Sequence, residues 1–135
     1  MSSAVSFKNQ LAAFAQKAGQ RIEVTTRAAV EGIGERLILR TPVDTGFMAS
    51  NWNFSLKAPD LTVREQTSVR ELNGFDATTE ALAGRKAYVS NAVHYCLYVE
   101  YGTSRMGPQP MVGPTAIEWP SIVAEAVQHA KAARP

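Results

Sequence analysis

Residues 6–40 read SFKNQLAAFAQKAGQRIEVTTRAAVEGIGERLILR, and this stretch decides the fold. Its apolar positions recur mostly at intervals of three and four, the period of an amphipathic helix. These positions are Phe7, Leu11, Phe14, Ala18, Ile22, Ala29, Ile33 and Leu37. Such a helix would be about 50 Å long, which is more than a compact chain of 135 residues needs. We therefore expect part of it to lean on a neighbouring molecule.

The C-terminal end of this helical pattern carries two signals. Gly32 and Gly34 weaken a helix relative to alanine, so they allow a bend or break near residues 32–34. Pro42 is expected to end the helix, because the residue before a proline is pushed out of the helical region.

After Gly46 the apolar period changes from helical to alternating. Met48, Trp52, Phe54 and Leu56 alternate with polar residues, which is typical of a half-buried strand. Residues 87–93 also have strand-like composition, residues 61–69 alternate weakly as a second strand or an arm, and Asn73-Gly74 marks a turn. A short helix is expected over residues 76–82. Pro120 is expected to kink the final helix or to restart its first turn.

These patterns predict an α+β fold in a single domain, residues 1–135. The expected parts are a long N-terminal helix (6–40), a small, mostly antiparallel β-sheet within residues 47–106, a short middle helix and a C-terminal helix (114–132) packed on the sheet. No metal, cofactor or catalytic residue is predicted.

Composition narrows the class of function. The net charge of +2 is nearly balanced, which disfavours a polyanion-binding protein. The single cysteine, Cys96, excludes an intrachain disulfide, and with His94 it makes packing or an interface contact more common than a metal site. No apolar run approaches the ~20 residues that span a bilayer, and a signal peptide is not expected.

Residues 91–106, NAVHYCLYVEYGTSRM, predict a packed corner built on a single helical turn. Tyr95, Tyr98 and Tyr101 recur at intervals of three and are placed on one side of that turn. Glu100 is expected to be partly desolvated and to need a partner, with Arg105 the nearest candidate, within one subunit or between subunits.

The aromatic residues of this chain can be interpreted as core residues or as interface residues. Trp52, Tyr98, Tyr101 and Trp119 are most simply core residues, because aromatic side chains bury large areas. The corner and the proline-rich turn after it are nevertheless rich in the residue types that concentrate at interfaces. The predicted subunit or partner interface consists of Tyr98, Glu100, Tyr101, Arg105, Met106 and Met111.

Asp44-Thr45-Gly46 is the strongest competing signal, because this tripeptide carries the catalytic carboxylate of aspartic proteases. A retroviral-type homodimeric protease is therefore the enzyme alternative. That site needs an aspartate after an apolar strand, whereas here a long helix and Thr41-Pro42 precede it. We favour a structural turn made by Pro42, Asp44, Thr45 and Gly46, with a positive φ at Gly46. A small nucleic-acid-binding module is a third alternative, although the basic residues are scattered.

Several of these segments together resemble a known family over roughly residues 35–118. Thr41-Pro-Val-Asp-Thr-Gly46 and Ser50-Asn-Trp52 precede the corner motif N-x-x-x-Y-x-x-Y-V-E-Y-G-T and a proline-punctuated final helix. This arrangement resembles the tail-completion, or head–tail joining, proteins of long-tailed phages.

The resemblance implies a structural role without chemistry. It implies a subunit that assembles with itself into a ring, with six copies expected, at the head–tail joint of the virion. The implied neighbours are a head connector or stopper protein and a tail tube or tail terminator protein. Phage DNA would pass through the lumen without sequence recognition, no membrane is involved, and assembly would take place in the host cytoplasm.

Overall fold

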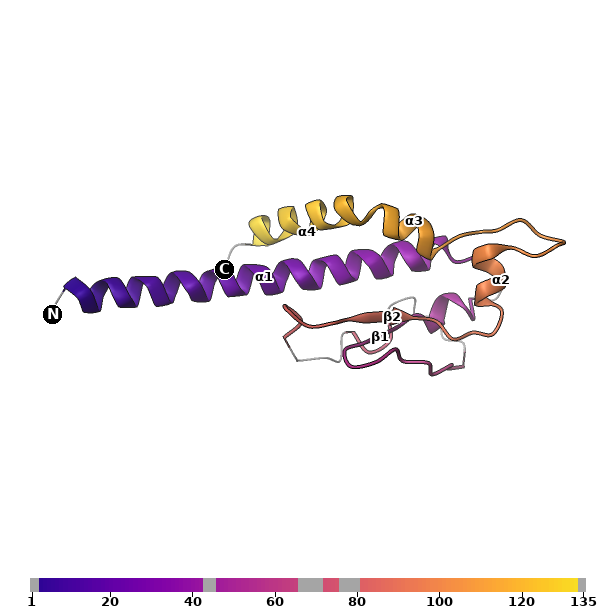
Figure 1. Ribbon diagram of the computed structural model, residues 1–135, viewed down its shortest axis with the longest axis horizontal. Helices are drawn as coiled ribbons and strands as arrows, with labels where there is room; N and C mark the ends of the chain where they lie inside the picture. Colours follow the sequence, from indigo (N-terminus) through magenta and orange to yellow (C-terminus); the bar gives the residue numbers. More distant parts are fainter. Residues whose placement is uncertain (1–2, 43–45, 66–71, 76–80, 134–135) are drawn as a thin grey trace.

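The computed structural model describes residues 3–42, 46–65, 72–75 and 81–133. Its elements, in chain order, are α1 (Ser3–Arg40), the 3₁₀ helix η1 (Ala49–Asn51), β1 (Asn53–Ser55), β2 (Tyr88–Ser90), α2 (Cys96–Tyr101), α3 (Val112–Ile117) and α4 (Trp119–Ala133). A long helix, a two-stranded antiparallel sheet and short helices make the α+β fold that the sequence predicts. Figure 1 shows α3 and α4 on one side of α1 and the two strands on the other.

Helix α1 has 38 residues and is about 57 Å long at 1.5 Å per residue. It continues through Gly32 and Gly34, so the chain does not use the break that these glycines allow. Packing explains Gly34, because a Cβ atom there would lie 2.5 Å from Cγ of Leu72. The glycine therefore lets Leu72 sit directly against the helix backbone.

The C-terminal helix packs on α1 and not on the sheet, which corrects the sequence prediction. Ala29 of α1 meets Ile122 and Ala126 of α4 in a small apolar cluster. Small residues at such a contact let two helices approach closely. Since α1 lies between α4 and the strands, the sheet is covered by α1 (Figure 1).

Two arginines of α1 fasten the C-terminal helices to it. Arg36 Nε lies 3.3 Å from Glu118 Oε2, and Arg36 Nη2 lies 3.1 Å from Glu125 Oε2. Arg40 pairs with the same Glu118 and donates a hydrogen bond to Thr115 Oγ1 at 2.9 Å.

The final helix restarts near Glu118, as predicted, because α3 ends at Ile117 and Pro120 lies in the first turn of α4.

The sheet is smaller than the alternating pattern predicts. Strand β1 pairs antiparallel with β2, Phe54 lying opposite Val89, but residues 49–51 form the 3₁₀ helix η1. Ser50 Oγ and Asn51 Nδ2 both donate hydrogen bonds to the Phe47 carbonyl, at 2.9 and 2.8 Å. Such local bonds compete with strand pairing and explain the shortened strand.

The core lies between the second half of α1, β1 and the residues that follow α2. Trp52, Leu82 and Met111 are among its largest fully buried side chains. Trp52 Nε1 donates a hydrogen bond to Thr41 Oγ1 at 2.8 Å, and Thr41 Oγ1 donates one to the Leu37 carbonyl at 2.7 Å. This chain of bonds fixes the end of α1 to the start of the sheet.

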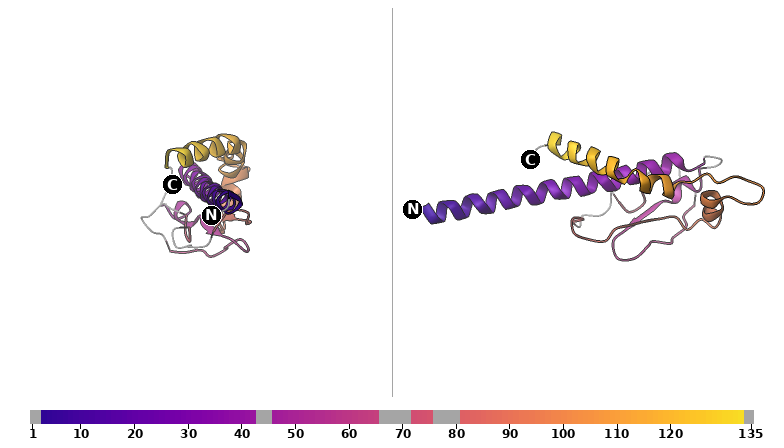
Figure 2. Two further views of the ribbon diagram at one scale, coloured as in Figure 1. Left: turned by 90° about the vertical axis from the view of Figure 1, so that its left-hand side faces the viewer. Right: turned by 45° about the horizontal axis from the view of Figure 1, so that its top comes forward.

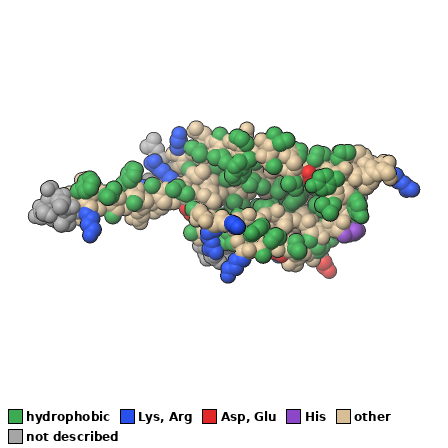
Figure 3. All heavy atoms as spheres, in the orientation of Figure 1, with side chains coloured by type: hydrophobic (Ala, Val, Ile, Leu, Met, Phe, Trp, Pro, Cys, Tyr) green, Lys and Arg blue, Asp and Glu red, His purple; other side chains and the backbone are tan. Residues whose placement is uncertain are grey.

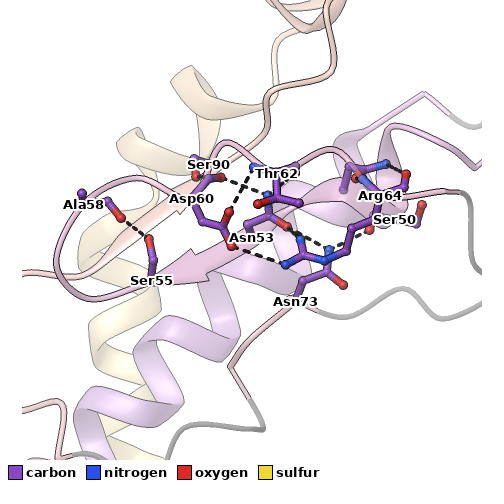
Figure 4. A network of polar contacts seen from close by, with 10 residues as sticks. Ser50, Asn53, Ser55, Ala58, Asp60, Thr62, Arg64, Asn73 and Ser90 are labelled. Carbon is purple, nitrogen blue, oxygen red and sulfur yellow. Dashed lines mark hydrogen bonds and ion pairs between the residues drawn. The ribbon is translucent and has the colours of Figure 1, made fainter.

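A polar network holds residues 56–65 against β1 (Figure 4). Asn53 Nδ2 donates to the carbonyls of Asp60 and Thr62, at 3.0 and 2.8 Å, and the Arg64 guanidinium reaches both Asn53 and Asp60. In the described ranges, no buried polar side-chain atom lacks a hydrogen-bond partner. The network is therefore satisfied internally and holds a loop in place.

Two other sequence predictions concern turns and short elements. Gly74 has a φ of +87°, which confirms the Asn73-Gly74 turn. Residues 61–65 form no strand, and 66–69 lie outside the described residues. Most of the expected short helix over 76–82 lies outside them too, and Leu82 is not helical.

Candidate assembly surface

The first half of α1, residues 3–22, projects from the body of the molecule, and we call this segment the arm (Figures 1 and 2). Its apolar side chains lie on one face at intervals of three and four. They are exposed by 65% at Phe7, 56% at Leu11, 71% at Phe14 and 56% at Ile22. Figure 3 shows hydrophobic side chains along this projecting part of the molecule. A stripe with this spacing usually marks a helix face that packs against something.

A second apolar surface is formed by the corner that the sequence singles out. Helix α2 is the single turn predicted there, and its exposed face carries Leu97, Tyr98 and Tyr101, the last two exposed by 58% and 76%. Tyr95 is half-buried and packs on the core with Cys96 and Val99. The three tyrosines therefore do not share one side, and Tyr98 and Tyr101 are surface residues.

Glu100 has a partner that the sequence did not indicate. Its carboxylate accepts hydrogen bonds from the backbone amides of Met111, Val112 and Gly113, at 2.7, 2.9 and 3.0 Å. Burial raises the pKa of Glu100, but these amide bonds outweigh burial and leave the pKa below its ordinary value. Glu100 thus holds the start of α3 to α2 within one chain, which corrects the expected pairing with Arg105.

The other predicted interface residues divide between surface and core. Arg105 and Met106 lie in an exposed turn in which Thr103 Oγ1 accepts hydrogen bonds from both of their backbone amides. Met111 is fully buried in the core, and this corrects its placement at the interface. Of the three residues whose amides bind Glu100, only Met111 turns its side chain into the core, whereas Val112 and Gly113 are exposed.

His94 and Cys96 do not form a reactive pair. His94 is exposed, whereas burial and the nearby Glu100 carboxylate raise the pKa of the Cys96 thiol. A thiol with a raised pKa is a weak nucleophile and a weak metal ligand. Within the part of the chain that the structure describes, no three His, Cys, Asp or Glu side chains gather as a metal site would require.

The turn after α1 is only partly described. Asp44 and Thr45 lie outside the described residues. Pro42 follows the end of α1, and Gly46 has a φ of +83°, as the turn interpretation predicts. Ahead of Asp44 the chain is therefore helical up to Arg40.

Sequence reasoning missed several exposed apolar residues near the C-terminal helices. Leu39, Ile117 and Trp119 are among the exposed large side chains, and Trp119 had been expected in the core. Ile117 and Trp119 flank the junction of α3 and α4, where the helical pattern restarts at Pro120. Ile117 is the last residue of α3 and Trp119 the first of α4, so both lie where one helix gives way to the next.

None of the helices in the described ranges has both the length and the apolar character needed to cross a membrane. A comparison of the chain with protein-family models, with curated proteins and with solved structures finds no match, so its own surfaces carry the functional argument.

Proposed function

We propose that this chain is a structural virion protein of a tailed phage. Copies of it assemble into a ring at the head–tail joint, where the ring completes or terminates the tail and lets the DNA pass through its lumen. The sequence resemblance over residues 35–118 suggests this role. The observation that carries it is the arm, which exposes an apolar stripe that the described part of this chain leaves uncovered.

The position of the two apolar surfaces favours a ring. The arm and the α2 corner lie at opposite ends of the molecule (Figure 1). If the arm of one copy binds a different surface of the next copy, assembly runs head to tail and closes into a ring where the rotation permits. A ring subunit also needs a surface for the next component along the virion axis. The exposed Tyr98, Tyr101 and Met106 suit that second contact, with a head connector or stopper or with a tail tube or terminator protein.

The protease alternative receives less support from the described residues. A protease of the retroviral type places its catalytic aspartate after an apolar strand, and α1 runs to within four residues of Asp44. The sheet in the described part of the chain has two strands of three residues each. A nucleic-acid-binding module receives less support, because the net charge of the chain is only +2 and its 14 basic residues are nearly balanced by 12 acidic ones.

Native mass measurement of the full chain tests the ring. We expect a mass of six or twelve copies, and electron microscopy of the same sample should show a central hole. A strict dimer that cleaves peptides, with cleavage lost in Asp44→Asn, would replace the ring with the protease. For a turn residue, Asp44→Asn should keep folding and assembly, because an amide side chain still accepts local backbone bonds.

A further inference from the structure

No described residue of the chain covers the arm. Helix α1 is continuous from Ser3 to Arg40, so it holds residues 3–22 away from the body to which residues 23–40 belong. Two phenylalanines on the arm, Phe7 and Phe14, together expose roughly 250 Å² of apolar side chain, given the area that such side chains bury. That is a substantial part of the ~800 Å² that each partner contributes to a stable interface.

Charge separates the arm from the rest of the chain. Residues 3–22 contain three basic side chains, Lys8, Lys17 and Arg21, and no acidic one. None of these three forms an ion pair with another described residue. The two cations Lys17 and Arg21 are four residues apart and border the apolar stripe on the same side. A surface that accepts the arm should therefore be apolar at its centre and acidic at its edge.

The body of the same chain offers such a surface between α1 and α4, which we call the α1–α4 groove. Apart from Arg36, its buried and half-buried residues are small or apolar: Ala28, Gly32, Ile122 and Ala126. Its volume is about 210 Å³, and a cavity of about 150 Å³ is enough for a benzene ring. The groove thus has room for a phenylalanine side chain of the arm.

The edge of the groove is acidic. Glu31, Glu35 and Glu125 line it together with the exposed His129 and with Arg36, which is already paired with Glu118 and Glu125. Glu31 and Glu35 are exposed and form no ion pair among the described residues. They are four residues apart on a helix, a spacing of about 6 Å along the axis, and so are Lys17 and Arg21. The two pairs therefore match in spacing and are opposite in charge.

We propose that the arm of one copy docks in the α1–α4 groove of the next copy, with Phe14 entering the groove and Lys17 and Arg21 facing Glu31 and Glu35. This contact rests on the proposed function in one respect, namely that the chain assembles with itself. Because arm and groove are different surfaces of one chain, each copy has one of each left to offer, and the contacts run head to tail around a ring. The α2 corner remains free for a different protein.

Charge exchange tests this contact in the full-length chain. Lys17→Glu/Arg21→Glu reverses the arm, and Glu31→Lys/Glu35→Lys reverses the edge of the groove. Each variant alone should associate at least about tenfold more weakly than the wild type, because two exposed ion pairs become repulsive. Mixed in equal amounts, the two variants should assemble again, since each reversed arm then meets a reversed groove and each original arm an original groove. Lys57→Glu/Lys86→Glu makes the same change in net charge as the arm variant at exposed residues of the body and serves as its matched control.

Native mass and circular dichroism, measured together, distinguish the outcomes. Wild-type assembly of either reversed variant alone would overturn the contact, and so would two failing variants that do not recover when mixed. In both cases the proposed function would still stand if the wild-type chain itself forms a ring. If the wild type forms only closed dimers and the mixed variants recover that dimer, the contact is supported and the ring is overturned. A wild type that stays monomeric at every concentration would overturn both.

Discussion

The two halves of α1 have the same helical period but different surroundings. Residues 23–40 contact the sheet region on one side and α4 on the other, and Val30, Leu37 and Ile38 are buried there. Residues 6–17 are exposed on every side, although Phe7, Leu11 and Phe14 are as apolar as the buried residues. The comparison teaches that a stripe with helical spacing predicts a packing face without telling which molecule covers it.

The boundary between the two halves is marked by Glu23. Its carboxylate accepts hydrogen bonds from the backbone amides of Leu82, at 2.9 Å, and Ala83, at 3.1 Å, and it pairs with Arg27 at 3.0 Å. These are the contacts nearest the arm that tie α1 to a distant part of the chain. The body therefore begins at Glu23, two residues after Arg21.

The largest expected difference is between two phenylalanines. Phe54→Ala should lower the free energy of unfolding by about 3–5 kcal/mol, because Phe54 is buried in the core. Phe14→Ala should change it by less than about 0.5 kcal/mol, because Phe14 is 71% exposed among the residues that the structure describes. Urea unfolding at a concentration where the chain is monomeric measures both. Equal losses would mean that the arm folds back on the body.

A proline placed in each half of α1 should also affect the stability of the chain very differently. Ala29→Pro interrupts α1 where it packs on α4 and should cost about 3 kcal/mol or more. Ala13→Pro interrupts only the exposed arm, so helicity should fall while the midpoint of thermal unfolding stays the same. Circular dichroism on heating reports both quantities. A lowered midpoint in Ala13→Pro would show that the arm stabilises the body.

Replacing glycine by alanine should destabilise the chain at Gly34 and stabilise the helix at Gly19. A Cβ at Gly34 would lie 2.5 Å from Cγ and 2.6 Å from Cδ1 of Leu72, so Gly34→Ala should destabilise the chain by about 1–3 kcal/mol. Gly19 has no atom within 4 Å of such a Cβ, so Gly19→Ala should raise helicity, with a gain of up to about 1 kcal/mol in helix stability. Helicity and unfolding midpoints of both variants check this, and a stabilised Gly34→Ala would contradict the packing of Leu72.

The smallest effect concerns the boundary itself and depends on pH. Burial raises the pKa of Glu23, but the amides of Ala83 and Leu82 and the Arg27 guanidinium outweigh burial and lower it below the ordinary value. A pKa that is lower in the folded chain contributes stability above the unfolded value of about 4.3, and this contribution is lost as the pH falls through the folded value.

Glu23→Gln should therefore cost about 1 kcal/mol near neutral pH and less at pH 3. Denaturant unfolding at both pH values measures this, with the exposed Glu65→Gln as the control. A cost that is the same at both pH values would mean that charge at Glu23 does not hold residues 82–83.

Local sequence patterns predicted the secondary-structure elements and turns. They did not predict the contacts between residues that are far apart in the chain. The helical period located α1, and Asn73-Gly74 and Gly46 identified backbone with positive φ. The partner of Glu100 was not predictable, because the amides of residues 111–113 come to it through the fold and leave no pattern in the sequence. Of the candidate interface residues, Tyr98, Tyr101, Arg105 and Met106 are exposed, whereas Met111 is buried.

The sequence by itself determined the α+β class, the long helix with its apolar stripe and the helical turn at the tyrosine corner, because each depends on residues close together in the chain. Only the tertiary structure decided that α4 packs on α1, that Gly34 admits Leu72 and that half of the stripe stays uncovered. Those outcomes depend on which surfaces fit one another in space. The arm is long and basic because of its sequence, but it is exposed because the body ends where Glu23 holds residues 82–83.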